Sequence, residues 1–346
     1  MTFFTRVGFP KDYEPRPRQT PALLSHVFKN RAATVNAWVT RHLNGEGRDG
    51  DKYRNGKFKV VNSGEVDLEA YAKRRNGHAG VTEEQVLSKF PKADRSYIEK
   101  MLKKVAMSLP TDREFTDGEG HYTDKRVLEH ERILGKLFSP ENIARCTPAK
   151  GESKTLIVLG GRGGSGKSNL TNGNLQVPDT FDPKKFLHLD SDWIKEQLPG
   201  YEGWNAALYH EEASHVLEQA KAKAFSLGMN IIDDATLRST THIGEDMAFA
   251  MEHNYVVNGA YMFLDRKEAA GRAVTRALGK GEKKRERGRL VPPHVVLDNV
   301  NNEKNFNGFK KYFSKWWAFD NSVPEGVPPF QIGGGTNGEN RRKVYP

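Results

Sequence analysis

The sequence predicts an α/β fold in which helices flank a parallel sheet, preceded by a mostly α-helical N-terminal domain. After residue 150, short apolar runs alternate with amphipathic segments, the pattern of parallel strands joined by helices. Before residue 150, apolar residues recur at helical spacing instead. We therefore divide the chain into a helical region of unknown role (1–150), an α/β domain (151–323) and a Gly- and Pro-rich C-terminal tail (324–346). We expect that tail to be loose.

The composition is that of a soluble globular protein, with 36% hydrophobic and 28% charged residues. No apolar run approaches the roughly 18 residues of a membrane span. The first 15 residues lack the basic and long apolar regions of a secretory signal. Cys146 is the single cysteine, which excludes an internal disulfide and a multi-cysteine metal site. We expect a cytoplasmic protein with no membrane partner.

Most of the net charge of +10 lies in the first part of the chain. Residues 1–150 carry 28 Lys and Arg against 20 Asp and Glu, a net +8, and residues 151–346 carry 26 against 24, a net +2. A basic surface of this kind could bind nucleic acid. A solvated helical surface rich in Lys and Arg has the same composition, so charge alone does not identify a partner.

The N-terminal region is predicted to hold several helices and little chemistry. Thr82 followed by two acidic residues is a favourable helix start. His121 and His130 lie nine residues apart without accompanying ligands, and we interpret both as ordinary residues on helix surfaces. The predicted elements are helices 21–43, 66–74, 82–90, 94–109 and 123–138, a short strand 57–61 and a short helix opened by Ser139.

The α/β domain begins with an apolar strand that runs into a glycine-rich loop, KTLIVLGGRGGSGKSNL. Gly161-x-x-x-x-Gly166-Lys167-Ser168 between a strand and a helix is the complete P-loop pattern. Its glycines let successive N–H groups point at phosphate oxygens, Lys167 reaches the β- and γ-phosphates, and Ser168 offers a hydroxyl to Mg²⁺. We predict that the loop binds a nucleoside triphosphate, ATP or GTP, with Mg²⁺. The predicted contacts are Gly161, Arg162, Gly163, Gly164, Ser165, Gly166, Lys167, Ser168 and Asn169.

Strands and helices are predicted to alternate after the P-loop, and two carboxylates follow the second strand. Strand ends face the nucleotide in such a sheet, so Asp192 could accept the proton of an attacking hydroxyl, as a kinase base does. Asp190 could help to hold Mg²⁺ or cap the next helix. The predicted strands are 186–190, 230–234, 256–264 and 316–323, and the predicted helices are 193–198, 205–227, 244–254, 292–299 and 302–314.

The segment 267–289 is strongly basic, with nine Lys and Arg against three Glu. It resembles the lid of small-molecule P-loop kinases, in which guanidinium groups close over the transferring phosphoryl group and exclude water. Arg276 lies on a helical stretch and Arg289 at the far end of the lid. The residues between them, 280–287, are typical of a solvated loop.

The motifs GGRGGSGKS, HLDSDWIK, GMNIIDDATLRSTT and RLVP, in this order, resemble the zeta toxin family of P-loop kinases. The resemblance covers residues 154–323. It implies a P-loop kinase-like fold, phosphorylation of a sugar hydroxyl of UDP-N-acetylglucosamine, and an antitoxin that holds the toxin in check. Two positions depart from the family: Asp234 stands where Glu is usual, and Arg162 where a smaller residue is common.

The resemblance also implies roles for single residues. Lys167 and Ser168 would contact phosphate and Mg²⁺, and Asp192 would be the base for the sugar hydroxyl. Arg276 and Arg289 would surround the γ-phosphate. The remaining residues assigned to the substrate site are Asp190, Glu218, Asp234, Thr236 and Arg238.

Two other functions remain compatible with the sequence. A nucleic-acid kinase would use the same core, and the basic N-terminal half would suit its substrate. An NTP-binding interaction protein, whose helical half docks on a larger assembly, would need the P-loop but no catalysis. The intact P-loop, Asp192 and both lid arginines favour a working enzyme over that last possibility.

Overall fold

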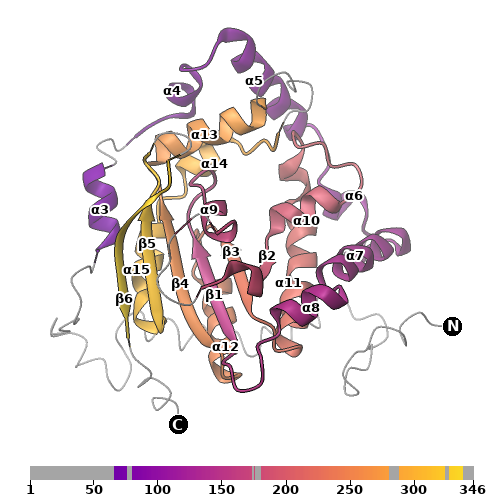
Figure 1. Cartoon of the computed structure of the whole chain (residues 1–346). Coiled ribbons are helices and arrows are strands. Elements are labelled where there is room, and N and C mark those ends of the chain that lie inside the picture. The colour runs from indigo at the N-terminus through magenta and orange to yellow at the C-terminus, as the bar shows by residue number, and fades with distance from the viewer. Residues whose placement is uncertain are drawn as a thin grey trace.

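The computed structural model describes residues 66–75, 80–173, 175, 181–279, 288–323 and 327–337. Its centre is one six-stranded sheet with helices on both faces (Figure 1). The strand order is β2-β3-β1-β4-β5-β6, so the strand before the P-loop is internal, with β3 and β4 paired to it in parallel. The strands are β1 Thr155–Gly160, β2 Leu187–Leu189, β3 Ile231–Ala235, β4 Val256–Phe263, β5 Lys315–Asp320 and β6 Phe330–Thr336.

The sheet confirms the predicted parallel α/β class, with one difference at its edge. We expected the residues from 324 onward to be loose, which is wrong for β6, because it pairs antiparallel with β5. The Gly-rich sequence of β6 fits the neighbouring indole of Trp316: a Cβ on Gly335 would lie 2.5 Å from Trp316 Nε1. Glycine serves close packing on a strand here and does not mark a loop.

The helices of the α/β part follow the predicted alternation. The predicted helix 205–227 differs in its first turn, which is a 3₁₀-helix, Ala206–Tyr209, before the α-helix begins at His210. The α-helices are α9 Ser168–Thr171, α10 Ser191–Gln197, α11 His210–Ser226, α12 Thr241–Glu252, α13 Arg266–Leu278, α14 Pro293–Leu297 and α15 Asn302–Phe309.

Six helices precede the sheet in the described part of the N-terminal region: α3 Leu68–Arg75, α4 Glu83–Leu87, α5 Lys92–Ala106, α6 Thr111–Glu114, α7 Asp124–Leu137 and α8 Pro140–Cys146. The predicted helix start at Thr82 is confirmed as a capping box, in which Thr82 and Gln85 each accept from the other's backbone N–H. The predicted helix 21–43 and strand 57–61 lie outside the described residues.

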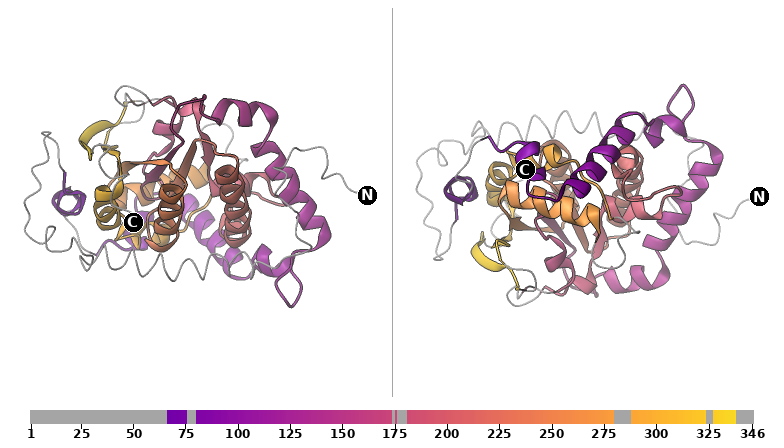
Figure 2. Two further views of the ribbon diagram at one scale, coloured as in Figure 1. Left: turned by 90° about the horizontal axis from the view of Figure 1, so that it is seen from below. Right: turned by 90° about the horizontal axis from the view of Figure 1, so that it is seen from above.

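The N-terminal helices share buried surfaces with the α/β elements. Helices α4 and α5 lie across α13 and α14 (Figures 1 and 2), where Val86, Leu87 and Ile98 join one apolar cluster with Ala273 and Leu297. Helix α3 packs beside α15, on the β6 side of the sheet (Figure 1). Because these clusters are mixed, the N-terminal helices and the α/β elements bury apolar surface together.

Helix α7 is joined to α11 by a buried polar group that we call the Glu212 cluster: Arg126, His130 and Glu212. Arg126 donates two hydrogen bonds to the carboxylate, at 2.5 and 2.8 Å, and His130 Nε2 lies 2.7 Å from Glu212 Oε1. All three residues are buried. The interpretation of His130 as a helix-surface residue is therefore wrong, because α11 covers it, whereas His121 is partly exposed beside Asp117.

Among the described residues, no helix is long and apolar enough to cross a membrane.

Candidate functional site

The P-loop connects β1 to α9 at the internal position of the sheet. Gly161, Gly164 and Gly166 adopt φ values of 147°, 83° and 87°, which favour glycine. A Cβ on Gly164 would lie 2.4 Å from the carbonyl oxygen of Ala269, and one on Gly166 would lie 2.1 Å from Asn321 Nδ2. The glycine pattern therefore reflects both backbone conformation and the close approach of α13 and the end of β5.

Asn321 holds the P-loop from the side of β5. Its side-chain amide donates a hydrogen bond of 2.8 Å to the carbonyl oxygen of Ser165, and its own N–H donates to that of Phe263. Both Ser165 and Asn321 are buried. Sequence reasoning missed Asn321, because it lies 156 positions from its partner and belongs to no motif.

The side chain of Arg162 is turned into the core, and only 1% of the residue is exposed. It donates to the carbonyl oxygen of Leu264, to Asn302 Oδ1 at 2.7 Å and to Glu303 Oε2 at 2.8 Å. Its guanidinium thus fastens the start of α15 to the P-loop. A phosphate contact predicted for Arg162 would have to come from its backbone N–H.

Lys167 lies between the P-loop and the ends of β2 and β3. Its Nζ donates to the carbonyl oxygen of Gly161 at 2.8 Å and lies 3.4 Å from Asp234 Oδ1. Ser168, the first residue of α9, is exposed, and Asn169 donates from its side chain to the carbonyl oxygen of Gly166. These positions leave the Lys167 ammonium beside the loop that would hold phosphates.

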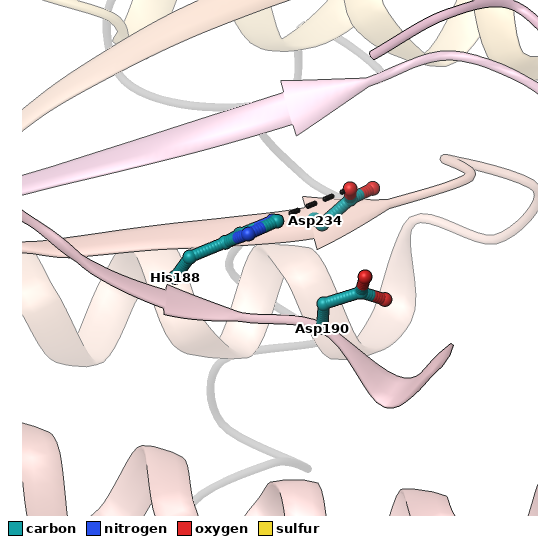
Figure 3. A group of neighbouring side chains, drawn as sticks. All are labelled: His188, Asp190 and Asp234. Atoms are coloured by element: carbon teal, nitrogen blue, oxygen red, sulfur yellow. Dashed lines mark ion pairs between the residues drawn. The ribbon is translucent and has the colours of Figure 1, made fainter. Parts of the chain in front are cut away.

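His188, Asp190 and Asp234 form a group that could hold a cation, which we call the His188 cluster (Figure 3). One ligand atom from each lies within 4.8 Å of the others, and His188 Nε2 is 3.4 Å from Asp234 Oδ2. Burial and the charges of Asp234 and Asp192 raise the pKa of Asp190. Carboxylate oxygens suit Mg²⁺, so the cluster fits the predicted role of Asp190 near the metal, and His188 was not foreseen there.

Asp190 also caps α10, because its side chain accepts a hydrogen bond of 2.8 Å from the backbone N–H of Asp192. Capping of this helix was the other role predicted for Asp190. Asp192 in turn lies in the first turn of α10, with Lys195 Nζ 3.0 Å from one oxygen and Arg289 paired to the other. Burial alone would raise the pKa of Asp192, but Lys195 and Arg289 lower it below its ordinary value. Its carboxylate is therefore ionised at neutral pH, as a proton acceptor must be.

The two predicted lid arginines lie together beside Asp192, and we call Asp192, Arg276 and Arg289 the lid cluster. Burial and the neighbouring Arg289 lower the pKa of Arg276 to about 10. Within the described part of the chain, Nε and Nη2 of Arg276 and Nε of Arg289 are buried without a hydrogen-bond partner. Buried donors of this kind call for an acceptor that a bound anion could provide. The basic loop 280–287 between them lies outside the described residues.

Glu218 lies on α11 with 53% of its side chain exposed, 3.6 Å from Lys221 Nζ. Lys221 is buried and also contacts Asp246 at 2.7 Å and Asp233 at 3.2 Å. Three carboxylates thus surround one ammonium, a group that the sequence analysis did not find beyond Glu218 itself.

Thr236 and Arg238 are exposed on either side of Leu237, which is buried with φ at 52°. The left-handed turn is held by α15 and the segment before it: Asn305 Nδ2 donates to the carbonyl oxygen of Leu237 at 2.8 Å, and Asn299 Nδ2 to that of Thr236 at 3.2 Å. Their predicted substrate contacts remain predictions, but their exposure after β3 leaves both side chains accessible.

The site combines a P-loop with a carboxylate from α10, one arginine from α13 and a second arginine from the segment before α14. This is the arrangement of the P-loop kinases. The zeta toxin family model matches residues 140–314, just over half of the chain. The chain belongs to the zeta toxin family, which is a family of kinase-type toxins. The resemblance drawn from the motifs is confirmed, and the match begins with α8 and ends before β5.

Solved structures were also compared with this fold. A protein from the PezAT chromosomal toxin-antitoxin system of Streptococcus pneumoniae is 19% identical over 58% of this chain and 79% of its own, with a TM-score of 0.41. A chain of the AvrRxo1-ORF1:-ORF2 structure with ATP is 14% identical over 67% and 80%, with a TM-score of 0.48. A chain of the AvrRxo1 complex with sulphate ions is 15% identical over 65% and 72%, with a TM-score of 0.47. No curated protein matched the chain.

Proposed function

We propose that this protein is a Mg²⁺-dependent kinase that transfers the γ-phosphate of ATP or GTP to a hydroxyl of a small acceptor. The observation that carries the proposal is the lid cluster, in which an ionised Asp192 adjoins two arginines with unpaired buried donors. A base beside an anion-binding pair is what hydroxyl phosphorylation requires. Family membership supports a nucleotide sugar such as UDP-N-acetylglucosamine as the acceptor and a protein antitoxin as a partner.

The P-loop would hold the nucleotide. The backbone N–H groups of the loop would cradle the β- and γ-phosphates, and Lys167 would leave Asp234 to contact these phosphates. Ser168 would hold Mg²⁺ together with Asp190 and Asp234 of the His188 cluster, whose oxygen ligands suit that ion. Bound Mg²⁺ would neutralise phosphate charge and orient the γ-phosphoryl group.

Asp192 would take the proton of the acceptor hydroxyl while the hydroxyl oxygen forms a bond to the γ-phosphorus. The bond from that phosphorus to the β–γ bridging oxygen breaks, and the nucleoside diphosphate leaves with those electrons. Arg289 would exchange its pairing with Asp192 for the γ-phosphate, which frees the carboxylate oxygen for the proton. Arg276 would neutralise charge on the same phosphoryl oxygens.

The test is incubation with γ-labelled ATP or GTP, Mg²⁺ and a panel of nucleotide sugars and oligonucleotides, with mass spectrometry of the products. We expect a phosphorylated nucleotide sugar, and none with Lys167→Ala. Label on the oligonucleotides alone would make the protein a nucleic-acid kinase. Nucleotide binding with no transfer to any acceptor would favour an interaction protein instead.

Asp192→Asn should still bind nucleotide but lose about 10²- to 10⁴-fold in turnover, because an amide cannot accept the proton. Glu196→Gln is the control, since it removes a carboxylate from an exposed position of the same helix. If Asp192→Asn keeps nearly the turnover of the wild type while Asp190→Asn loses it, the base has been assigned to the wrong carboxylate.

A further inference from the structure

A tyrosine, Tyr201, borders the lid cluster in the loop that follows α10. We propose that Tyr201 binds the phosphoryl acceptor through its phenol hydroxyl, which makes it a specificity-determining residue of the site. The inference rests on the proposed kinase function and adds a residue that no motif in the sequence identified.

The loop that carries Tyr201, residues 199–205, is fixed by its own hydrogen bonds. The buried Asn205 donates from its side chain to the carbonyl oxygen of Gly200 at 2.9 Å and accepts from the N–H of Glu202 at 2.8 Å. The carbonyl oxygen of Pro199 accepts from the hydroxyl of Tyr209 at 2.9 Å. A backbone held in this way positions the Tyr201 side chain without help from a ligand.

The same loop is attached to the far end of the lid. The N–H of Leu290 donates to the carbonyl oxygen of Gly203 at 3.0 Å. Leu290 directly follows Arg289, whose guanidinium is paired with Asp192. The loop therefore adjoins the candidate base and the lid arginine at once, in the region where an acceptor hydroxyl would meet the γ-phosphate.

The phenol hydroxyl of Tyr201 is buried and has no hydrogen-bond partner among the described residues. Its ring packs edge-to-face on Tyr209, with centroids 5.7 Å apart. Burial, opposed by Arg289, raises the pKa of Tyr201 to about 12, so the hydroxyl is protonated and can donate at neutral pH. Buried tyrosine hydroxyls ordinarily find a partner, as that of Tyr209 does.

Tyr201 is close enough to the lid cluster that the charges of Arg276, Arg289 and Asp192 all act on its hydroxyl. Several unpaired donors around one carboxylate require a ligand rich in oxygen. The guanidinium groups of Arg276 and Arg289 suit the charged phosphoryl group. The neutral phenol suits a hydroxyl, ether or carbonyl oxygen of the acceptor, and a sugar offers such oxygens next to its reacting hydroxyl.

Tyr201→Phe tests the inference, because it removes one oxygen and keeps the ring on Tyr209. We expect the KM for the phosphorylated member of the nucleotide-sugar panel to rise about 2- to 10-fold, the range for losing a hydrogen bond between neutral groups. The affinity for a non-hydrolysable ATP analogue should not change. The melting temperature should stay the same or rise, since an unpaired buried hydroxyl is removed.

Tyr255→Phe is the matched control, since among the described residues its hydroxyl is also buried without a partner, but Tyr255 precedes β4, at the end of the sheet away from the lid cluster. It should leave the acceptor KM unchanged, and the melting temperature should stay the same or rise. An unchanged acceptor KM in Tyr201→Phe, with the wild type active, would overturn the role of Tyr201 and leave the kinase proposal standing. A wild type that phosphorylates no acceptor would count against both.

Discussion

The Glu212 cluster and the lid cluster both contain buried arginine, and they satisfy it in opposite ways. Every nitrogen of the Arg126 guanidinium has an acceptor: Nε and Nη2 donate to Glu212, and Nη1 donates to the carbonyl oxygen of Pro199. In the lid cluster, Nε and Nη2 of Arg276 have none among the described residues. The first cluster is complete within the protein, whereas the second offers donors to something else.

This difference teaches how to separate structural from functional arginines in one chain. A buried charge that is fully paired stabilises the fold, and breaking the pair is costly. A buried charge with free donors weakens the fold and is kept for a ligand. Arg162, which donates to Asn302 and Glu303 inside the core, falls mainly in the first class although it lies within the P-loop.

Removing the carboxylate of the Glu212 cluster should have the largest effect on stability. Glu212→Gln leaves Arg126 and His130 buried without their counter-charge, and we expect a loss of about 3–5 kcal/mol in the free energy of unfolding. Urea unfolding measures it, with the exposed neighbour substitution Glu211→Gln as the control. Turnover per folded molecule should change little; a stable but inactive variant would mean that this cluster also serves the reaction.

Removing a lid arginine should lower turnover more than it lowers stability. Arg276→Ala or Arg289→Ala should lower turnover about 10²- to 10³-fold, as for other preorganised donors at a developing charge. Arg276→Ala should not lower the free energy of unfolding, since its Nε and Nη2 have no partner among the described residues. Arg289→Ala also removes the ion pair with Asp192, so Arg276→Ala is the cleaner test of the difference. Lys at either position should recover only part of the rate, because it lacks the planar fork of guanidinium. Destabilisation without a rate loss would place these arginines in the structural class.

The smallest effect concerns His215, which packs against Tyr122 and His130 beside the Glu212 cluster. Burial and His130 lower the pKa of His215 to about 4 from 6.5. As the pH drops, His215 binds a proton at a higher pH in the unfolded chain than in the folded protein. The free energy of unfolding should therefore fall between pH 6.5 and pH 4. We expect about 1–3 kcal/mol over that window.

His215→Phe keeps a ring against Tyr122 and should remove most of this dependence, measured by urea unfolding at several pH values. Substitution of the exposed His253 by Phe is the control for losing one histidine. A pH profile of the His215 variant that matches the wild type would assign the acid sensitivity to other groups.

The parts of the fold that could be predicted depend on local patterns. The P-loop, the cap at Thr82 and the alternation of strands and helices each occupy a short stretch of sequence, where spacing reflects structure directly. The Gly-rich strand β6 could not be predicted, because its glycines have low strand propensity and the strand is defined by its pairing with β5.

The site residues likewise divide into those that a local motif identified and those that depend on partners distant in the sequence. Asp192, Arg276 and Arg289 were identified through motifs, and the fold brings them together. The supporting residues Asn321 and Lys221 were missed, since their roles arise from partners distant in sequence. Arg162 was noticed as unusual for its family, but only the position of α15 explains it.

The brace that Asn321 provides to the P-loop also sets an order of events during protein synthesis. The ribosome releases the loop 156 residues before the amide that holds Ser165. Until β5 and Asn321 have emerged, a nascent chain lacks both this brace and the strand that follows β4 in the sheet. In this member of a toxin family, the contact that braces the P-loop therefore forms only after most of the chain has been synthesised, and a chain that ends before residue 321 lacks it.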